Sequence, residues 1–266
     1  VTTLATKVEE LGFESLWLPE HPIIPVHRIQ QTDPDSEDGV LPKQYFDVVD
    51  QFVALGAVAA VTSTLKIATG ITLVPERNPL LLAKEVATVD LISGGRFLFG
   101  IGAGWLKEET EIMGGNFPRR WSQTRESILA MKQLWTTVES EFHGEFYDFP
   151  PVYSFPRPVQ RPHPPIHLGG SAKNVFKRVV EYGDGWMPAL GGPEVILEGR
   201  RELDRLCEEV GRDSSSIEIT AFHEPADREL IKKLEEAGTD RVILELGTIK
   251  TDEALAQLES HAEAVL

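Results

Sequence analysis

The feature that most constrains the fold is a regular alternation of short apolar runs with longer amphipathic segments. The short runs resemble buried parallel strands and occupy residues 15–19, 66–74, 96–101, 166–169, 185–188, 217–222 and 241–246. The longer segments have apolar residues at helical spacing and occupy residues 4–11, 45–61, 80–91, 121–137, 172–182, 193–210, 228–237 and 252–265. Repeated units of this kind predict an α/β fold in which helices cover parallel strands.

The number of predicted strands is one short of a closed barrel. There are seven, and the chain enters on the predicted helix at residues 4–11. A closed barrel needs an eighth strand ahead of residue 1, whereas an open barrel would leave two exposed edges, a costly arrangement. We therefore expect a TIM-type (β/α)8 barrel, a single domain over residues 1–266, with its first strand apparently missing from this sequence.

Two segments fall outside the alternation. Residues 141–165 combine aromatic alternation with many prolines, which predicts an insertion, a hairpin plus an extended segment, too short to hold its own core. Residues 22–43 carry Pro, Asp and Gly without periodicity. They predict a long loop, and loops of this length in compact domains are usually lids or binding segments.

Charge and composition exclude several classes of function. The formal net charge of −16 repels polyanions, so we expect neither nucleic acid nor membrane as a partner, although local cations could still bind a small anion. No apolar run of about 18 residues or signal peptide is present, which favours a cytoplasmic protein. The one cysteine, Cys207, and the spacing of the seven histidines predict no metal site.

In an α/β barrel the active site forms where strands end and loops begin. His21 follows the first predicted strand and is the obvious proton-handling candidate, because histidine titrates near neutral pH. The alternative is a histidine that only packs and hydrogen-bonds. Glu20 could orient His21, although adjacent residues on a strand point to opposite faces.

Two glycine-rich segments also follow predicted strands. Residues 169–171 are Gly-Gly-Ser before a predicted helix, an arrangement that suits a phosphate but also an unliganded turn; Lys173, Lys177 and Arg178 favour an anion. Residues 100–104 (GIGAG) lack the third glycine of the dinucleotide fingerprint and the later acidic residue, so we reject a Rossmann site. These glycines more plausibly admit a flat ring close to the backbone.

Several segments together resemble the luciferase-like flavin and deazaflavin oxidoreductases. They are LGFESLWLPEH, ATGITLVPERNPLLLAKEVATVDLISGGRFLFGIGAGW, PRPVQRPHPPIHLGGSAKN and YGDGWMP. The resemblance covers residues 6–188, with a weaker tail. It implies a (β/α)8 barrel with a cofactor across the strand ends, and it is closer to the branch that uses the deazaflavin coenzyme F-420 (8-hydroxy-5-deazaflavin) than to the long-chain bacterial luciferases.

The resemblance also implies roles for individual residues. Catalysis would involve His21 and Glu20 near the ring edge. The cofactor would contact a bulge with a non-prolyl cis peptide at Gly70-Ile71, then Thr72 and Leu73, the ring pocket at Ala103, Gly104 and Trp105, and the phosphate site at Gly169, Gly170 and Ser171. One residue departs from the pattern: deazaflavin sugar-phosphate dehydrogenases of this family have Glu where this chain has Trp105. Sugar-phosphate oxidation is therefore doubtful.

The resemblance implies hydride transfer between coenzyme F-420 and a small organic substrate, with His21 as proton donor or acceptor. Two alternatives remain open: an FMN-dependent luciferase-like monooxygenase, and a non-catalytic flavin-binding member of the family. Family members are commonly dimers, so a homodimer is expected. Phe46 and Phe52 could supply its interface or could instead pack onto the barrel.

Overall fold

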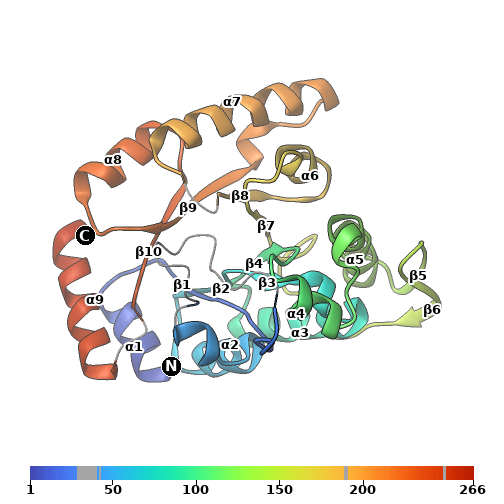
Figure 1. Cartoon of the computed structure of the whole chain (residues 1–266), viewed down its shortest axis with the longest axis horizontal. Coiled ribbons are helices and arrows are strands. Elements are labelled where there is room, and N and C mark those ends of the chain that lie inside the picture. Colours follow the sequence, from blue (N-terminus) through green and yellow to red (C-terminus); the bar gives the residue numbers. More distant parts are fainter. Residues whose placement is uncertain (29–40, 42, 189–190, 248–249) are drawn as a thin grey trace.

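Parallel strands and helices alternate in the computed structural model (Figure 1), which describes residues 1–28, 41, 43–188, 191–247 and 250–266. The strand order is β1-β2-β4-β7-β8-β9-β10, with β3 also paired to β4, and every pairing is parallel. These strands are β1 (Ser15–Leu18), β2 (Lys66–Thr69), β3 (Thr72–Leu73), β4 (Phe97–Gly102), β7 (Ile166–Gly169), β8 (Gly185–Met187), β9 (Glu218–Glu224) and β10 (Arg241–Leu244). The sheet is nearly closed into a barrel, which confirms the predicted fold class.

Helices surround this sheet. They are α1 (Thr2–Glu10), α2 (Gln51–Val61), α3 (Pro79–Ser93), α4 (Lys107–Ile112), α5 (Arg120–Thr136), α6 (Val175–Tyr182), α7 (Pro193–Val210), α8 (Arg228–Glu236) and α9 (Thr251–Val265), with short 3-10 turns η1 (Lys43–Phe46), η2 (Val74–Glu76), η3 (Phe117–Arg119) and η4 (Ser214–Ser216). The helix predicted at residues 45–61 starts later because the Asp50 side chain caps it, accepting the Val53 N–H. Helix α4 was not predicted.

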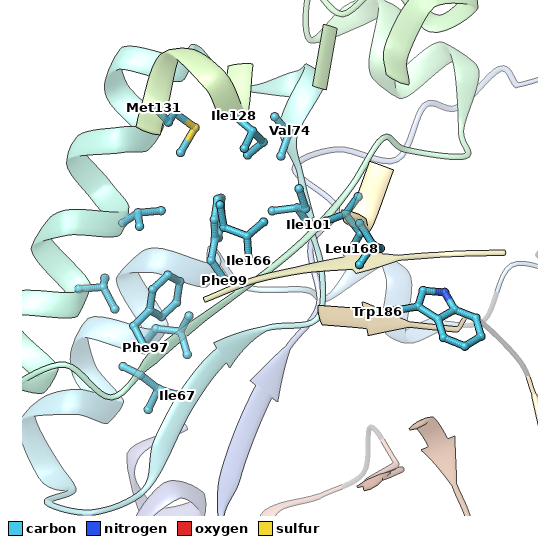
Figure 2. Packing of buried hydrophobic residues seen from close by; sticks show 14 of the residues in the cluster. Ile67, Val74, Phe97, Phe99, Ile101, Ile128, Met131, Ile166, Leu168 and Trp186 are labelled. Atoms are coloured by element: carbon cyan, nitrogen blue, oxygen red, sulfur yellow. The ribbon is translucent and has the colours of Figure 1, made fainter. Parts of the chain in front are cut away.

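The main core lies between the outer face of the sheet and the helices. Residues Phe97, Phe99 and Ile101 alternate along β4 and are fully buried, each contributing roughly 1.5–3 kcal/mol by burial. Figure 2 shows these side chains beside Ile166 of β7, with Ile128 and Met131 near them. Odd positions of β4 therefore face the helices, and the even positions Leu98, Gly100 and Gly102 face the other side of the sheet.

The two ends of the strand order, β1 and β10, are joined by an ion pair. Arg241, at the start of β10, donates from Nε to Glu14 Oε2 at 2.6 Å and from Nη1 to Glu218 Oε2 at 3.0 Å. Helices α1 and α9 lie side by side next to these strands (Figure 1). Within the described ranges no backbone pairing joins β1 to β10. The additional strand expected ahead of residue 1 stays a prediction.

The proline-rich segment contains the predicted hairpin. Strands β5 (Glu139–His143) and β6 (Asp148–Tyr153) are antiparallel and extend beyond α5 in Figure 1. Glu126 of α5 accepts the backbone N–H groups of residues 145, 146 and 147 at 3.0, 2.6 and 2.6 Å. The hairpin is therefore anchored to α5; its interpretation as an insertion within one domain stays a prediction. Most of the predicted loop at residues 22–43 lies outside the described residues.

The two phenylalanines considered for a dimer interface have different environments. Phe52 is buried against Phe97, with ring centroids 6.3 Å apart, whereas Phe46 is 56% exposed. Packing onto the barrel is therefore the role of Phe52, and the homodimer stays a prediction. In the part of the chain that the structure describes, no helix is long and apolar enough to cross a bilayer.

Trp186 of β8 is fully buried against α7. A Cβ added to Gly199 of α7 would lie 2.1 Å from the Trp186 ring, so only glycine fits there. By contrast, a Cβ on Gly56 of α2 would meet no atom within 4 Å. The indole Nε1–H of Trp186 donates to Gly170 O at 3.0 Å, and this packing therefore supports the loop after β7.

We expect Gly199→Ala to destabilise the protein by about 1–3 kcal/mol, because the added methyl group overpacks a rigid core. The matched change Gly56→Ala should stabilise it by about 0.5–1 kcal/mol, since alanine favours a helix interior. Urea denaturation measures both free energies of unfolding. Equal effects of the two substitutions would contradict the packing described for Trp186.

Glu9 of α1 fixes the turn that leads into β2. Its Oε1 accepts the backbone N–H groups of Ser63, Thr64 and Leu65 at 2.8, 2.6 and 2.9 Å. These bonds lower the pKa of Glu9 from 4.5 to about 2. Because the pKa is depressed in the folded state, the contribution of Glu9 to stability is complete above its unfolded value and is lost as the pH falls toward about 2.

Glu9→Gln should therefore lower the thermal midpoint near neutral pH, because a neutral amide is a weaker acceptor for three N–H donors. The difference from the wild type should shrink as the pH falls from about 4.5 to about 2. Scanning calorimetry across this range tests the prediction. A constant difference in midpoint would show that charge on Glu9 is irrelevant to this turn.

Candidate functional site

An interruption of one strand shapes the C-terminal rim of the barrel. Strands β2 and β3 are separated at Gly70-Ile71, whose peptide bond is cis as the resemblance implied. The buried Gln51 side chain donates from Nε2 to Leu18 O at 2.7 Å and to Ile71 O at 3.2 Å. Its Oε1 accepts the Thr72 hydroxyl at 3.0 Å. Gln51 thus pairs with Ile71 O and with the Thr72 hydroxyl at the interruption. It is a second donor to Leu18 O, which also accepts the Gly70 N–H at 2.8 Å.

The side chain of Ile71 covers two neighbouring strands. A Cβ at Gly102 would lie 2.0 Å from Ile71 Cδ1, and one at Gly169 would lie 3.1 Å from the same atom. A Cβ at Gly100 would lie 2.0 Å from Thr69 O. Gly100 and Gly102 therefore make room for the protein's own bulge, whereas the sequence suggested that they admit a ring directly. The Ile71 side chain is partly exposed and forms the floor of the candidate site at the rim.

Glu20 supports the strand that resumes after the bulge. Its Oε2 accepts the Leu73 N–H at 2.6 Å, and its Oε1 accepts Arg77 Nε at 2.8 Å. Burial raises the pKa of Glu20, while the charge of Arg77 opposes that rise. Both carboxylate oxygens are engaged by the protein, and the predicted part of Glu20 in catalysis stays a prediction.

His21 lies in an aromatic enclosure at the rim. Its Nδ1 is 2.7 Å from Glu109 Oε2 of α4, and its side chain is only 8% exposed. The imidazole centroid is 5.0 Å from the Tyr45 ring and 5.9 Å from the Trp105 ring. The structure therefore brings together the predicted proton-handling residue and a residue predicted for the ring pocket, although Tyr45 and Glu109 were not predicted.

A second buried carboxyl group lies next to Glu109. Glu76 of η2 accepts the Thr110 hydroxyl at 2.9 Å. Burial, followed by the negative charge of Glu109, raises the pKa of Glu76 to about 8. Gly104 has φ of +79°, and a Cβ there would lie 2.9 Å from Thr110 Oγ1. Gly104 therefore lets the loop after β4 pass over this carboxyl group, and the adjacent Ala103 is buried.

The loop after β7 differs from the predicted phosphate site. The Gly170 N–H donates to Met187 O at 2.8 Å, so it is engaged within the sheet, and Gly170 has φ of +110°. Ser171 is exposed, and α6 begins only at Val175, three residues later than predicted. The backbone of Gly170 is therefore not a free donor for a phosphate.

A cavity of about 330 Å³ with basic side chains in its lining lies between α5 and α6. One of its lining residues, Asn174, follows this loop in the sequence. It is lined by Trp121, Ser122, Arg125, Asn174, Lys177, Arg178 and Glu181. Arg178 stacks its guanidinium 4.3 Å from the Trp121 ring centroid. Its buried Nη1 has no hydrogen-bond partner among the described residues, whereas Arg125 is paired with Glu181. An unpaired buried guanidinium nitrogen suits a phosphate or carboxylate oxygen.

Sequence reasoning missed four residues of this site, namely Tyr45, Gln51, Glu76 and Glu109. Glu76 lies in a segment directly after a predicted strand, which could have singled it out. Glu109 lies in an acidic run (KEETE) that is typical of a solvated surface, so its burial could not be read from the sequence. In the described ranges, no group of three or more potential metal-ligating side chains gathers at one point.

The family of the chain follows from its similarity to known proteins. Residues 1–264 match the luciferase-like monooxygenase family. An uncharacterised protein from Mycobacterium tuberculosis is 36% identical over 261 residues, which cover 97% of this chain and 91% of that protein. An F420-dependent glucose-6-phosphate dehydrogenase from Amycolatopsis mediterranei is 28% identical over 244 residues, 87% of this chain and 66% of that protein.

Two further relatives show the range of this family. An FMNH(2)-dependent dimethylsulfone monooxygenase from Pseudomonas putida is 38% identical over 132 residues, 47% of this chain and 36% of that protein. The fold matches that of an F420-dependent secondary alcohol dehydrogenase, with a TM-score of 0.77 at 18% identity, over 100% of this chain and 94% of that one. The chain therefore belongs to the luciferase-like monooxygenase family of oxidoreductases, which includes F420-dependent and FMN-dependent enzymes.

Proposed function

We propose that this protein transfers a hydride between coenzyme F-420 and a small organic substrate, with His21 as proton donor or acceptor. The observation that carries the proposal is the enclosure of His21 by Tyr45 and Trp105 just after β1, the strand that pairs with β2 and so lies next to the one that leads into the Ile71 bulge. When bound, the deazaflavin supplies the hydride chemistry, and the protein supplies position and electrostatics. The F420-dependent relative from Amycolatopsis mediterranei supports this choice of cofactor.

The residues present fit such a cofactor at two points. Ile71, which lies over Gly102 and Gly169, offers an apolar surface for one face of a flat ring. The cavity beside Arg178 offers an unpaired donor for an anionic tail, with Lys177 on the same wall. We assign the anion contact to this cavity in preference to the backbone of Gly170, which is already engaged within the sheet.

The environment of His21 favours a substrate with a small polar head and apolar flanks. Tyr45 and Trp105 contribute apolar surface close to the imidazole, and the partly exposed rim leaves His21 able to exchange a proton with a substrate oxygen. Trp105 has no acidic group, which disfavours a mechanism that requires a carboxylic acid at that position. We therefore expect His21 to exchange a proton with the oxygen of a carbonyl or alcohol group on the substrate.

The rival function is an FMN-dependent monooxygenase, which the dimethylsulfone monooxygenase from Pseudomonas putida favours. Titrating the purified protein with F-420 and with FMN, and following the fluorescence of each, distinguishes the two. We expect saturable binding of F-420 at lower concentration than FMN. Binding of FMN alone would replace the proposal with its rival, and binding of neither would support a member without catalytic function.

His21→Asn should lower kcat for hydride transfer by about 10²–10⁴-fold, because it removes the group that exchanges the proton. Cofactor affinity should change by less than about threefold, since an amide of similar shape keeps the enclosure intact. Stopped-flow absorbance of the deazaflavin measures the rate, and fluorescence titration measures the affinity. Full activity in this variant would remove His21 from the mechanism.

Arg178→Met should weaken binding of the complete cofactor by about tenfold, or about 1.4 kcal/mol, because it removes the unpaired guanidinium donor and keeps contact with Trp121. Binding of a deazaflavin chromophore that lacks the phosphate tail should be unchanged. Lys173→Met is the matched control, since Lys173 lies outside the lining of the cavity. An equal loss for both ligands would place the tail elsewhere.

A further inference from the structure

The hydrogen-bond partner of His21 is Glu109, a buried carboxyl group on a short helix at the rim. Glu109 is completely buried, although it lies on the short helix α4 between the partly buried Glu108 and the exposed Glu111. Its Oε2 is 2.7 Å from His21 Nδ1, while its Oε1 is 3.4 Å from the Ile23 N–H. The first of these is a short, charge-assisted contact, and the second is at the outer limit of a hydrogen bond. His21 is therefore the principal partner of a fully buried carboxylate.

This contact determines which imidazole nitrogen can exchange a proton. An ionised carboxylate only accepts hydrogen bonds, so the Nδ1 that faces it must carry hydrogen. In a neutral imidazole the other nitrogen, Nε2, then has a free lone pair; in the protonated ring it carries the exchangeable proton. A carboxylate that orients a histidine in this way fixes the tautomer, as in other carboxylate–histidine pairs.

A second buried carboxyl group, Glu76, lies close to Glu109. Two buried carboxyl groups close together disfavour double ionisation, so one of them retains a proton. Glu76 accepts only the Thr110 hydroxyl, and its Oε2 has no partner among the described residues, whereas Glu109 has the imidazole. Burial raises the pKa of Glu76 to about 8.

The other charged groups near this pair do not alter that assignment. Glu20 adds negative charge near Glu76 and Arg77 adds positive charge, and the two are paired with each other. Tyr45 and Trp105 face His21 with aromatic rings. The burial of Glu76 and its unpartnered Oε2 therefore place a proton on Glu76 at neutral pH, and Glu109 serves as the acceptor that faces His21 Nδ1.

We propose that Glu109 is a positioning residue that holds His21 in the Nδ1–H tautomer, so that Nε2 exchanges protons at the rim, while protonated Glu76 keeps a second negative charge away from this pair. The inference deepens the proposed function and assigns roles to residues on α4 and η2. Its principal test does not require any cofactor, so the two proposals can fail separately.

The test is a long-range 1H–15N spectrum of the imidazoles in protein labelled with 15N-histidine, without cofactor. The loss of one set of signals in His21→Asn assigns those of His21. We expect the wild type to show the Nδ1–H form for the neutral ring. A neutral His21 in the Nε2–H form would overturn the proposal from the wild-type protein alone, even if a Glu109 variant failed to fold.

Glu109→Gln should lose this preference and give a mixture of tautomers, because an amide can either accept from or donate to Nδ1. Glu111→Gln is the matched control on the same helix, since Glu111 is exposed and pairs only weakly, at 3.8 Å, with Lys107. It should leave the His21 signals unchanged. Retention of the wild-type tautomer in Glu109→Gln would overturn the positioning role.

The proposed role of Glu76 is tested by a separate measurement, the pH dependence of the His21 nitrogen signals. As the pH rises through about 8, ionisation of Glu76 should shift the His21 nitrogen signals of the wild type. Glu76→Gln cannot ionise, and it should remove this step while keeping the Nδ1–H form. Persistence of the step in the variant would show that another group titrates there.

With cofactor and substrate, Glu109→Gln should lower kcat by about 10–100-fold with little change in KM, as loss of an orienting partner does. A rise in KM with unchanged kcat would instead indicate a role in substrate binding and would overturn the proposal. If the tautomer is as expected but F-420 does not bind, only the proposed function fails. If F-420 is turned over but the tautomer is Nε2–H, only this inference fails.

Discussion

The candidate site depends on the hydrogen bonds made by the buried side-chain amide of Gln51. It bonds Leu18 O at the end of β1, Ile71 O in the bulge and the hydroxyl of Thr72 after it. Without this partner the Ile71 carbonyl group in the bulge would lose its side-chain donor, and a buried polar group left unsatisfied costs about 1–3 kcal/mol. Leu18 O would keep the Gly70 N–H, which it accepts at 2.8 Å. With Gln51 in place, the bulge has a fixed shape, and Ile71 has a fixed place over Gly102 and Gly169.

Three buried carboxyl groups at the rim are stabilised in three different ways. Glu20 pairs with Arg77, Glu109 makes a hydrogen bond with the His21 imidazole, and burial raises the pKa of Glu76 to about 8. The chain has many acidic residues and a net charge of −16. The burial of these three is therefore a property of their positions in the fold and not of the composition. Burying a carboxyl group requires a partner or a proton, and the choice at each position determines which group can take part in proton transfer.

The sequence predicted the strands well because their apolar runs are short and bounded by turn residues; β7 was predicted at its observed bounds and most others within one or two residues. The rim position of His21, Trp105 and the cis bond at Gly70-Ile71 followed from strand ends and family resemblance. Helix α4 was missed because six residues are too few for helical periodicity, and with it Glu109. The hydrogen bond of Gly170 to β8 was not foreseen because it depends on pairing between strands, which local sequence does not show; the phosphate site at residues 169–171 stays a prediction.

Ile71 reaches over the backbones of Gly102 and Gly169 on two adjacent strands. The sizes of the side chains that positions 71, 102 and 169 can hold therefore depend on one another. Enlarging either glycine is compatible with the same backbone only if residue 71 becomes shorter, and a shorter residue 71 leaves a void that a methyl group on a neighbouring strand can fill. In related proteins that keep this bulge, the three positions should vary together as one steric unit, although they are separated along the chain by about thirty and about seventy residues.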